Sequence, residues 1–313
     1  MRNNSIDITS SALLIHMICL HSMQMAGLAD TVYCKASVIV FACFMPWFFF
    51  KSGVFFKQQQ TKDLIIKEAK RLLVPFVVFS AIGHIVYMFY LYQQDDTNII
   101  HYTLSPIKYF LQYGSIGGNL PLWFLTSLFV VKIVFNYIHK TQYLWLIGCI
   151  ATIPYLMFSF NIELPVYVAN ISAGLFFYAC GYYTKEIQER WYIVVPCIII
   201  FALSLLYNQT YIDMRMNQLV YGNFYLWYPL SLAGIIVLKT ISRIVAPIFL
   251  AIRVEVVARN GMLILCTHWI ILLSIGIILP NILGWKLFII NTIVLLVLIP
   301  LLIFTSKRLS IKF

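Results

Sequence analysis

The stretch IDITSSALLIHMICLHSM, residues 6–23, is apolar enough to enter a lipid bilayer. A membrane-spanning helix needs about 20 mainly apolar residues, with a range of roughly 17–25. The same stretch nevertheless contains Asp7 near its start and two histidines, His16 and His21. Ionisable side chains are costly inside a membrane, and those that occur there usually serve a function. The stretch therefore predicts a membrane span that carries part of a functional site.

The whole chain has the composition of a membrane protein. Of its 313 residues 62% are hydrophobic and 11% are charged, and the mean hydropathy is +0.88. A soluble domain is about 25% charged. The apolar residues form ten blocks long enough to span a bilayer: 8–26, 36–56, 72–92, 121–138, 143–161, 165–184, 191–208, 222–238, 260–280 and 284–305. We expect an all-α, polytopic integral membrane protein with about ten transmembrane helices and a single domain over residues 1–313.

The distribution of lysine and arginine predicts the orientation of the chain. With the N-terminus inside, 16 of the 22 basic residues fall in inner segments and 4 in outer segments, while Lys51 and Lys132 lie within spans. The four outer residues are Lys35, Lys108, Arg215 and Lys286. Cytoplasmic loops of membrane proteins carry an excess of Lys and Arg. The bias therefore predicts that the N- and C-termini are both cytosolic.

The net charge of +11 has two interpretations. Basic inner segments attract the anionic headgroups of the cytosolic leaflet, which makes membrane lipids one expected partner. The inner segments 57–71 and 239–259 also suit a cytosolic ligand that carries phosphate, because phosphate is bound by fixed cations. Within these segments the forked guanidinium groups of Arg71, Arg253 and Arg259 are the strongest candidates. The charges are not gathered into one patch, so nucleic acid is not an expected partner.

The first span places its polar residues on two faces. In an α-helix each residue turns by about 100°, so Asp7 and His21 lie within about 40° of each other, and Ser10 and His21 within about 20°. His16 lies about 140° away from His21. We expect the stripe of Asp7, Ser10 and His21 to line a cavity while His16 faces elsewhere. A packing role remains the alternative for each histidine.

Several motifs follow one another in a recognisable order. Asp7 precedes His21 by 14 residues, and the motifs that follow are FMPWFFFKSGVFF (44–56), KRLLVPF (70–76), PLWFLTSLF (121–129), ISAGLFFYACGYYTKE (171–186) and VARNGMLILCTHWI (257–270). Together they resemble the membrane-bound acyltransferase family 3. The resemblance covers nearly the whole chain, and each motif is weak when taken alone.

The resemblance implies an O-acyltransferase in the bacterial inner membrane. Such enzymes move an acyl group, commonly acetyl, from cytosolic acyl-CoA to a sugar hydroxyl of a surface or exported polysaccharide or its lipid-linked precursor. Other glycan-synthesis proteins are further expected partners. The histidine of the first helix is the expected catalytic residue, which maps onto His21. A neutral imidazole acts either as a general base toward the hydroxyl or as a covalent acyl carrier, and the sequence leaves both open.

One position departs from the family pattern. Members usually carry Arg or Lys eleven residues before the histidine, and here that residue is Ser10. Lys51 is a candidate for the missing charge, although snorkelling toward the headgroups is the favoured interpretation of a lysine at the inner end of a span. Trp123 and His268 are further site-lining candidates, with an interface aromatic and a helix-packing hydrogen bond as their respective alternatives.

Two other functions are alternatives to this interpretation. A catalytically inactive family member in a glycan-export complex is the first alternative, because of Ser10. A lipid-linked sugar transporter is the second, but the paired, interrupted helices of two related halves are not visible in the sequence. The seven cysteines lie mostly in apolar runs without a CxxC pair, which indicates packing residues, and no metal is expected.

The orientation can be tested with single cysteines in a cysteine-free background. A cysteine at position 62 should resist a membrane-impermeant thiol reagent applied to intact cells, whereas a cysteine at position 96 should react. The expected contrast follows from the Lys and Arg distribution. Labelling at position 62 from outside would invert the predicted topology.

Overall fold

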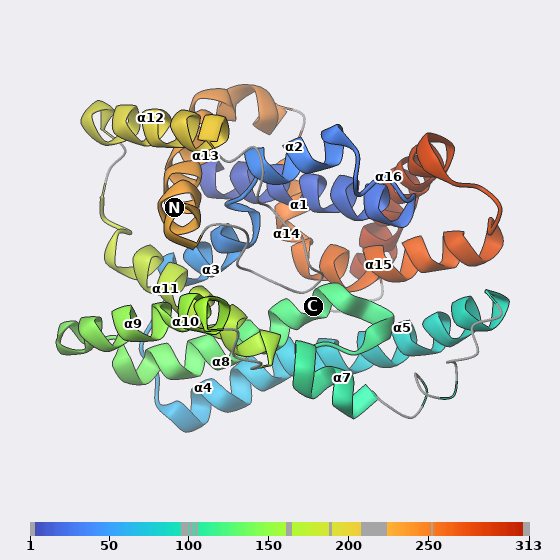
Figure 1. Ribbon diagram of the computed structural model, residues 1–313, viewed down its shortest axis with the longest axis horizontal. Helices are drawn as coiled ribbons and strands as arrows, with labels where there is room; N and C mark the ends of the chain where they lie inside the picture. The colour runs from blue at the N-terminus through green and yellow to red at the C-terminus, as the bar shows by residue number, and fades with distance from the viewer. Residues whose placement is uncertain are drawn as a thin grey trace.

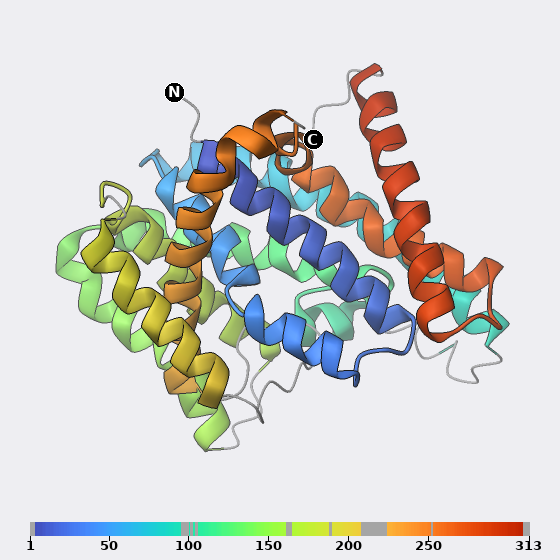
Figure 2. The same cartoon turned by 90° about the horizontal axis from the view of Figure 1, so that it is seen from above.

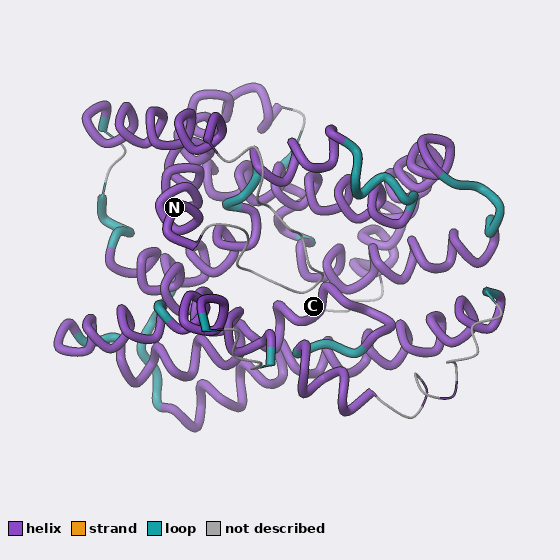
Figure 3. The backbone as a smooth tube through the Cα atoms, in the orientation of Figure 1, coloured by secondary structure: helices purple, strands orange, loops and turns teal. Residues whose placement is uncertain are grey.

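The computed structural model describes residues 4–94, 100, 103, 106–160, 165–187, 190–207, 224–251 and 253–308. These residues form helices, turns and loops, with no strand among them (Figure 3). The α-helices are α1 (Asn4–Met25), α2 (Val32–Val40), α3 (Phe44–Val54), α4 (Thr61–Glu68), α5 (Val74–Gln93), α7 (Pro106–Tyr113), α8 (Trp123–Ile138), α9 (Leu144–Ala151), α10 (Ile153–Ser159), α11 (Val166–Tyr183), α12 (Trp191–Tyr207), α13 (Phe224–Ala251), α14 (Glu255–Arg259), α15 (Gly261–Ile278) and α16 (Gly284–Arg308). The other helical segments are η1 (Ala69–Leu73), η2 (Gly117–Leu122) and η3 (Thr141–Tyr143).

Seven helical stretches within the described residues are long and apolar enough to cross a membrane. They are Asn4–Met25, Val32–Val54, Thr61–Gln93, Pro106–Ile138, Trp227–Leu250, Gly261–Ile278 and Gly284–Thr305. Shorter apolar helices cover Leu144–Met157 and Trp191–Leu203. The described parts of all ten blocks predicted from the sequence are largely helical. The chain is an all-helical polytopic membrane protein, as its composition predicted.

Helix α1 lies in the middle of the bundle (Figure 1). It contacts α2, α3, α13, α14, α15 and α16. Figure 2 shows α1 beginning and α16 ending on the same side of the molecule, as an even number of membrane crossings requires. At the periphery, large apolar side chains such as Val77, Ile85 and Phe89 of α5 are exposed, as expected of a surface in contact with lipid.

The second predicted span is interrupted by turns. The block 36–56 consists of α2 and α3 with turns between them. Pro46 has no N–H to continue a helix and its ring collides with the carbonyl four residues earlier, which explains the break.

The segments predicted as inner loops, 57–71 and 239–259, are largely helical. Helix α4 and η1 occupy the first segment, and the end of α13 together with α14 occupies the second. The backbone positions of the basic residues on these segments are therefore set largely by helices.

The tightest helix contact joins α3 to α11. A Cβ added at Gly53 would collide with the backbone carbonyl of Tyr178, and one added at Gly181 would collide with that of Phe50. Small residues allow membrane helices to approach until their backbones touch, which strengthens van der Waals packing. This packing matters in a membrane because the hydrophobic effect does not drive helices together in lipid. The contact fixes the position of α3 against the rest of the bundle.

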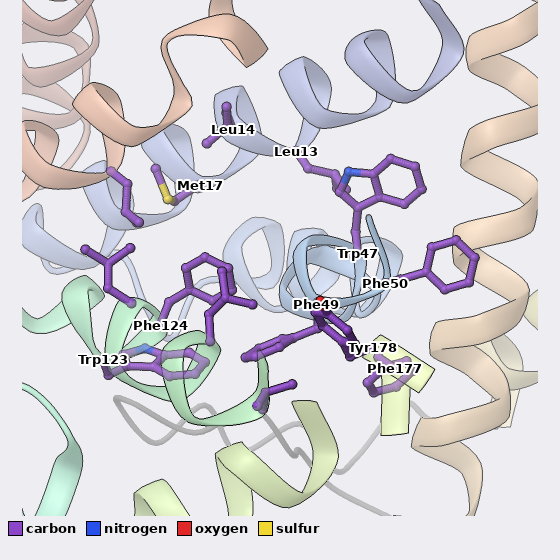
Figure 4. Close-up of a cluster of buried hydrophobic side chains, with 14 of the residues drawn as sticks. Leu13, Leu14, Met17, Trp47, Phe49, Phe50, Trp123, Phe124, Phe177 and Tyr178 are labelled. Atoms are coloured by element: carbon purple, nitrogen blue, oxygen red, sulfur yellow. The ribbon is translucent and has the colours of Figure 1, made fainter. Parts of the chain in front are cut away.

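Aromatic side chains fill the space around this contact (Figure 4). Figure 4 shows Trp47, Phe49 and Phe50 of α3 between Leu13 and Met17 of α1 and the aromatic residues of α8 and α11. These side chains belong to one buried hydrophobic cluster. The core therefore lies between α1, α3, α8 and α11, and it orients α3 toward α1.

The α3–α11 contact predicts a position-specific effect of adding one methyl group. Gly53→Ala should lower the thermal unfolding temperature in detergent, because overpacking a tight site costs about 1–3 kcal/mol. Gly148→Ala on α9 is the matched control, since nothing lies within 4 Å of an added Cβ there. The control should be neutral or slightly stabilising, because alanine is the better helix former. Equal unfolding temperatures for both variants would contradict the contact.

Candidate active site

A cavity of about 420 Å³ opens beside α1. Three residues of α1 line it: Ser10, Leu14 and Met17. Their spacing of four and three residues places them on one face of the helix. His21 follows Met17 by four residues, so the same face continues to the imidazole one turn beyond the cavity lining. Of the predicted stripe of Asp7, Ser10 and His21, Ser10 lines this cavity and the other two residues do not.

The cavity lining divides into a charged part and an apolar part. Six basic residues contribute to it together with one carboxylate, Glu68, among the described lining residues. The basic residues are Lys51, Lys57, Lys67, Arg71, Lys132 and Arg259. Four of these are exposed and mark the opening, whereas Lys51 and Lys132 are partly buried. Apolar residues such as Phe124, Met262 and Leu265 form the rest of the wall.

Hydrogen bonds hold the opening in place. Asn136 of α8 bonds to both backbone groups of Gln59: its Oδ1 accepts from the Gln59 N–H at 3.3 Å and its Nδ2 donates to the Gln59 carbonyl at 3.0 Å. The Lys67 ammonium donates to the Gln59 side chain at 3.1 Å. The segment between α3 and α4 is therefore fixed to α8 on one side of the cavity.

Glu68 organises two of the cations. Its carboxylate lies 2.8 Å from the Lys132 ammonium and 3.8 Å from the Arg71 guanidinium. The Glu68 side chain is 2% exposed and that of Lys132 is 12% exposed, so this ion pair is buried. Glu68 directly precedes η1, a π-helical turn, and such turns occur frequently at functional sites.

Ser10 is the meeting point of α1 and α3. Its hydroxyl donates to the Ile6 carbonyl at 2.7 Å and accepts from Trp47 Nε1 at 3.0 Å and from Lys51 Nζ at 2.8 Å. Lys51 thus turns into the cavity toward α1. The interpretation that Lys51 snorkels to the headgroups is wrong, because Ser10 and the cavity give its ammonium a polar environment inside the bundle.

His21 is paired with His268 of α15. His21 Nδ1 and His268 Nε2 lie 2.8 Å apart, and His268 Nδ1 lies 2.8 Å from the Ile264 carbonyl. A carbonyl only accepts, so His268 Nδ1 carries a proton, and the Nε2 of a neutral His268 then accepts from His21 Nδ1–H. The tautomers follow from this network and leave a lone pair on His21 Nε2. The arrangement suits a general base or a nucleophile.

Aromatic rings surround both histidines of α1. The rings of His21 and His268 are nearly parallel, with an interplanar angle of 11° and centroids 5.1 Å apart, and Trp269 stands perpendicular to His21 with ring centroids 5.3 Å apart. His16 lies elsewhere: it stacks on Phe41 with ring centroids 4.3 Å apart. The structure therefore separates the two histidines of α1, as their helical spacing predicted.

Some of the remaining predicted site residues line the cavity and others do not. Arg71 and Arg259 line the cavity, whereas Arg253 is exposed and does not. Asp7 is buried near the start of α1 outside the cavity lining. Trp123 is 6% exposed in the core beside Phe124, which differs from an aromatic at the membrane interface. The structure thus brings together His21 and His268, and separately Ser10, Arg71 and Arg259.

Sequence reasoning did not identify Glu68, Lys132 or Trp269 as parts of the site. A charged residue inside an apolar span was the available signal for Lys132, which lies within the block 121–138. No comparable signal marks Glu68, which lies among other charged residues in KEAKR. Trp269 directly follows His268 and its role depends on the packing of α15 against α1.

The site thus consists of a histidine pair within a bundle of membrane helices and a nearby cavity with basic residues at its opening. The chain matches the acyltransferase 3 family, described as an acyltransferase domain, over residues 3–306. The chain belongs to this family, as its motifs indicated. No curated protein and no solved structure matches it.

The buried Glu68–Lys132 pair predicts a strong dependence of stability on both partners. Lys132→Met should lower stability by about 3–5 kcal/mol, because it leaves a buried carboxylate without its closest cation. The double variant Glu68→Met/Lys132→Met should recover most of the loss. Thermal unfolding in detergent measures both.

The exposed pair of Asp30 and Lys35, 3.3 Å apart, serves as the control for this prediction. Asp30→Asn should change stability by about 1 kcal/mol or less, because water already solvates both groups. A Lys132→Met variant as stable as Asp30→Asn would show that the Glu68–Lys132 pair does not stabilise the fold.

Proposed function

We propose that the protein is an O-acyltransferase that moves an acyl group, acetyl in the simplest case, from cytosolic acyl-CoA to a sugar hydroxyl. The proposed acceptor is a surface or exported polysaccharide, or its lipid-linked precursor, at the bacterial inner membrane. Membership of the acyltransferase 3 family supports acyl transfer. The observation that carries the proposal is the single face of α1 that runs from the basic cavity to the His21–His268 pair.

The cavity offers each part of such a donor a matching surface. Exposed cations at the opening, Arg71 and Arg259 among them, suit the phosphates of the nucleotide part. The wall formed by Leu14, Met17 and Leu265 suits the less polar arm that carries the thioester. Met17 lies one helical turn before His21, so a donor extended along α1 presents its thioester to the imidazole.

The histidine pair supplies the chemistry of the transfer. His21 Nε2 takes the proton of the sugar hydroxyl as its oxygen attacks the thioester carbonyl carbon. A C–O bond forms, the C–S bond breaks, and the departing CoA thiolate takes up the proton from His21. His268 holds the ring of His21 in the required tautomer through its hydrogen bond. The alternative is an acyl group carried transiently on His21 Nε2, followed by attack of the hydroxyl.

The intact pair also bears on the alternative of an inactive family member. His21 is hydrogen-bonded to His268, and His268 in turn to the Ile264 carbonyl, so the chain retains the arrangement that the proposed chemistry requires. The departure at position 10 concerns the donor end of the cavity, about 16 Å from His21 along the helix. The observations therefore favour an active enzyme.

Replacement of His21 tests the proposed function. His21→Ala should reduce acylation of the surface glycan at least about 100-fold per unit of membrane-resident protein, the lower end for loss of a positioned acid–base group. His16→Ala is the matched control on the same helix, and it should retain most of the activity per molecule. The acyl content of the glycan, divided by protein abundance, is the measurement.

The acyl content per protein molecule distinguishes a catalytic histidine from one that only packs. A histidine that only packs would lower the abundance of the protein and leave the activity per molecule nearly unchanged. Normal acylation per molecule in His21→Ala would remove the catalytic assignment and favour a scaffold or transporter function instead.

A further inference from the structure

Lys51 has a place in the cavity that its position in the sequence does not predict. It belongs to α3, but its ammonium reaches across to α1 and donates to the Ser10 hydroxyl at 2.8 Å. The side chain is partly buried and lines the cavity. The ammonium is thus directed into the cavity at the level of Ser10.

The surroundings hold this ammonium in a fixed position. Ser10 is 1% exposed and Trp47, which donates to the same hydroxyl at 3.0 Å, is also 1% exposed. Gly53 fixes the following turn of α3 against the backbone of α11. A cation held before the ligand arrives binds an anion with less loss of side-chain entropy. The structure therefore presents a preorganised cation at this level of the cavity.

The separation along α1 between Ser10, which bonds to Lys51, and His21 can be compared with the length of a phosphopantetheine arm. Ser10 and His21 are eleven residues apart, which corresponds to about 16 Å along α1, and they lie on nearly the same face. In a phosphopantetheine arm about 13 covalent bonds separate the phosphorus from the sulfur, which gives roughly 16 Å when the arm is extended. A phosphate at Lys51 and an arm along Leu14 and Met17 would place the thioester carbon at His21.

We propose that Lys51 binds the phosphate at the start of the phosphopantetheine arm of the acyl donor and so sets the reach of its thioester. This assignment rests on the proposed function. It gives Lys51 a different role from Arg71 and Arg259, which are exposed at the opening and suit the more distant phosphates. Ser10 is then a positioning residue, because its hydroxyl holds the ammonium.

Three related compounds separate this role from a structural one: CoA, 4′-phosphopantetheine and pantetheine. Their affinities for the purified protein in detergent can be measured by calorimetry. The unaltered protein should bind 4′-phosphopantetheine at least about tenfold more tightly than pantetheine, because the phosphate adds charge-assisted hydrogen bonds. Lys51→Met should lose this preference, and Lys51→Arg should keep most of it. Lys140→Met, at an exposed lysine away from the cavity, should leave it unchanged.

An exchange variant tests the location of the charge. In Ser10→Lys/Lys51→Ser the cation moves from α3 to α1 while the same two side chains meet in the cavity. The exchange should restore the preference for 4′-phosphopantetheine that Lys51→Met loses. A lysine needed only to join α1 to α3 would lower the unfolding temperature when it is removed and would leave the preference intact.

The outcomes distinguish this inference from the proposed function. A phosphate preference that persists in Lys51→Met, or one that is missing from the unaltered protein although CoA binds, would overturn the role of Lys51 and leave the acyltransferase proposal standing. Failure of the unaltered protein to bind any of the three compounds would remove the CoA donor and this assignment together. Loss in Lys51→Met with recovery in the exchange variant would support the phosphate-binding role of Lys51.

Discussion

Two glycines let α3 and α11 touch through their backbones, and the arrangement of the cavity depends on that contact. Gly53 lies against Tyr178 and Gly181 against Phe50, so a shift of either helix would lose close van der Waals contact between the two backbones. The contact sets the rotation of α3 about its axis. That rotation in turn directs Trp47 and Lys51 toward Ser10 of α1. A packing constraint between two apolar helices thereby determines where a charge is held.

Among the described residues, three buried or partly buried charged side chains line the cavity: Glu68, Lys132 and Lys51. Inside a membrane, ionisable side chains persist only when they pair with one another or face a polar space. Glu68 and Lys132 satisfy the first condition, and Lys51 satisfies the second through Ser10 and the cavity. Neither arrangement is an efficient way to stabilise a fold, because well-packed apolar residues usually do as well as a buried ion pair. Under the proposed function Lys51 serves an acyl donor that carries negative charge, whereas the charge of Lys132 is paired with Glu68.

The sequence predicted the features that depend on one helix at a time. Block length and composition predicted the spans, and the 100° rotation per residue predicted that His16 and His21 face different partners. Features that depend on the relative placement of two helices could not be predicted from the sequence. The direction of Lys51 depends on how α3 is rotated, and the pairing of Glu68 with Lys132 joins residues 64 positions apart. The break at Pro46 is a local signal that the long apolar block concealed.

The histidine pair shows why the candidate base could be named from the sequence while its reactive atom could not. A histidine in an apolar span suggests an acid–base role, but each imidazole has two nitrogens, and their difference arises only from neighbours. Here the Ile264 carbonyl fixes the proton of His268, and His268 then fixes the proton of His21. These residues lie 247 positions apart in the chain, and helix α15 brings them together. The backbone of one helix thus determines which nitrogen on another is left with a lone pair, through two hydrogen bonds and no charged group.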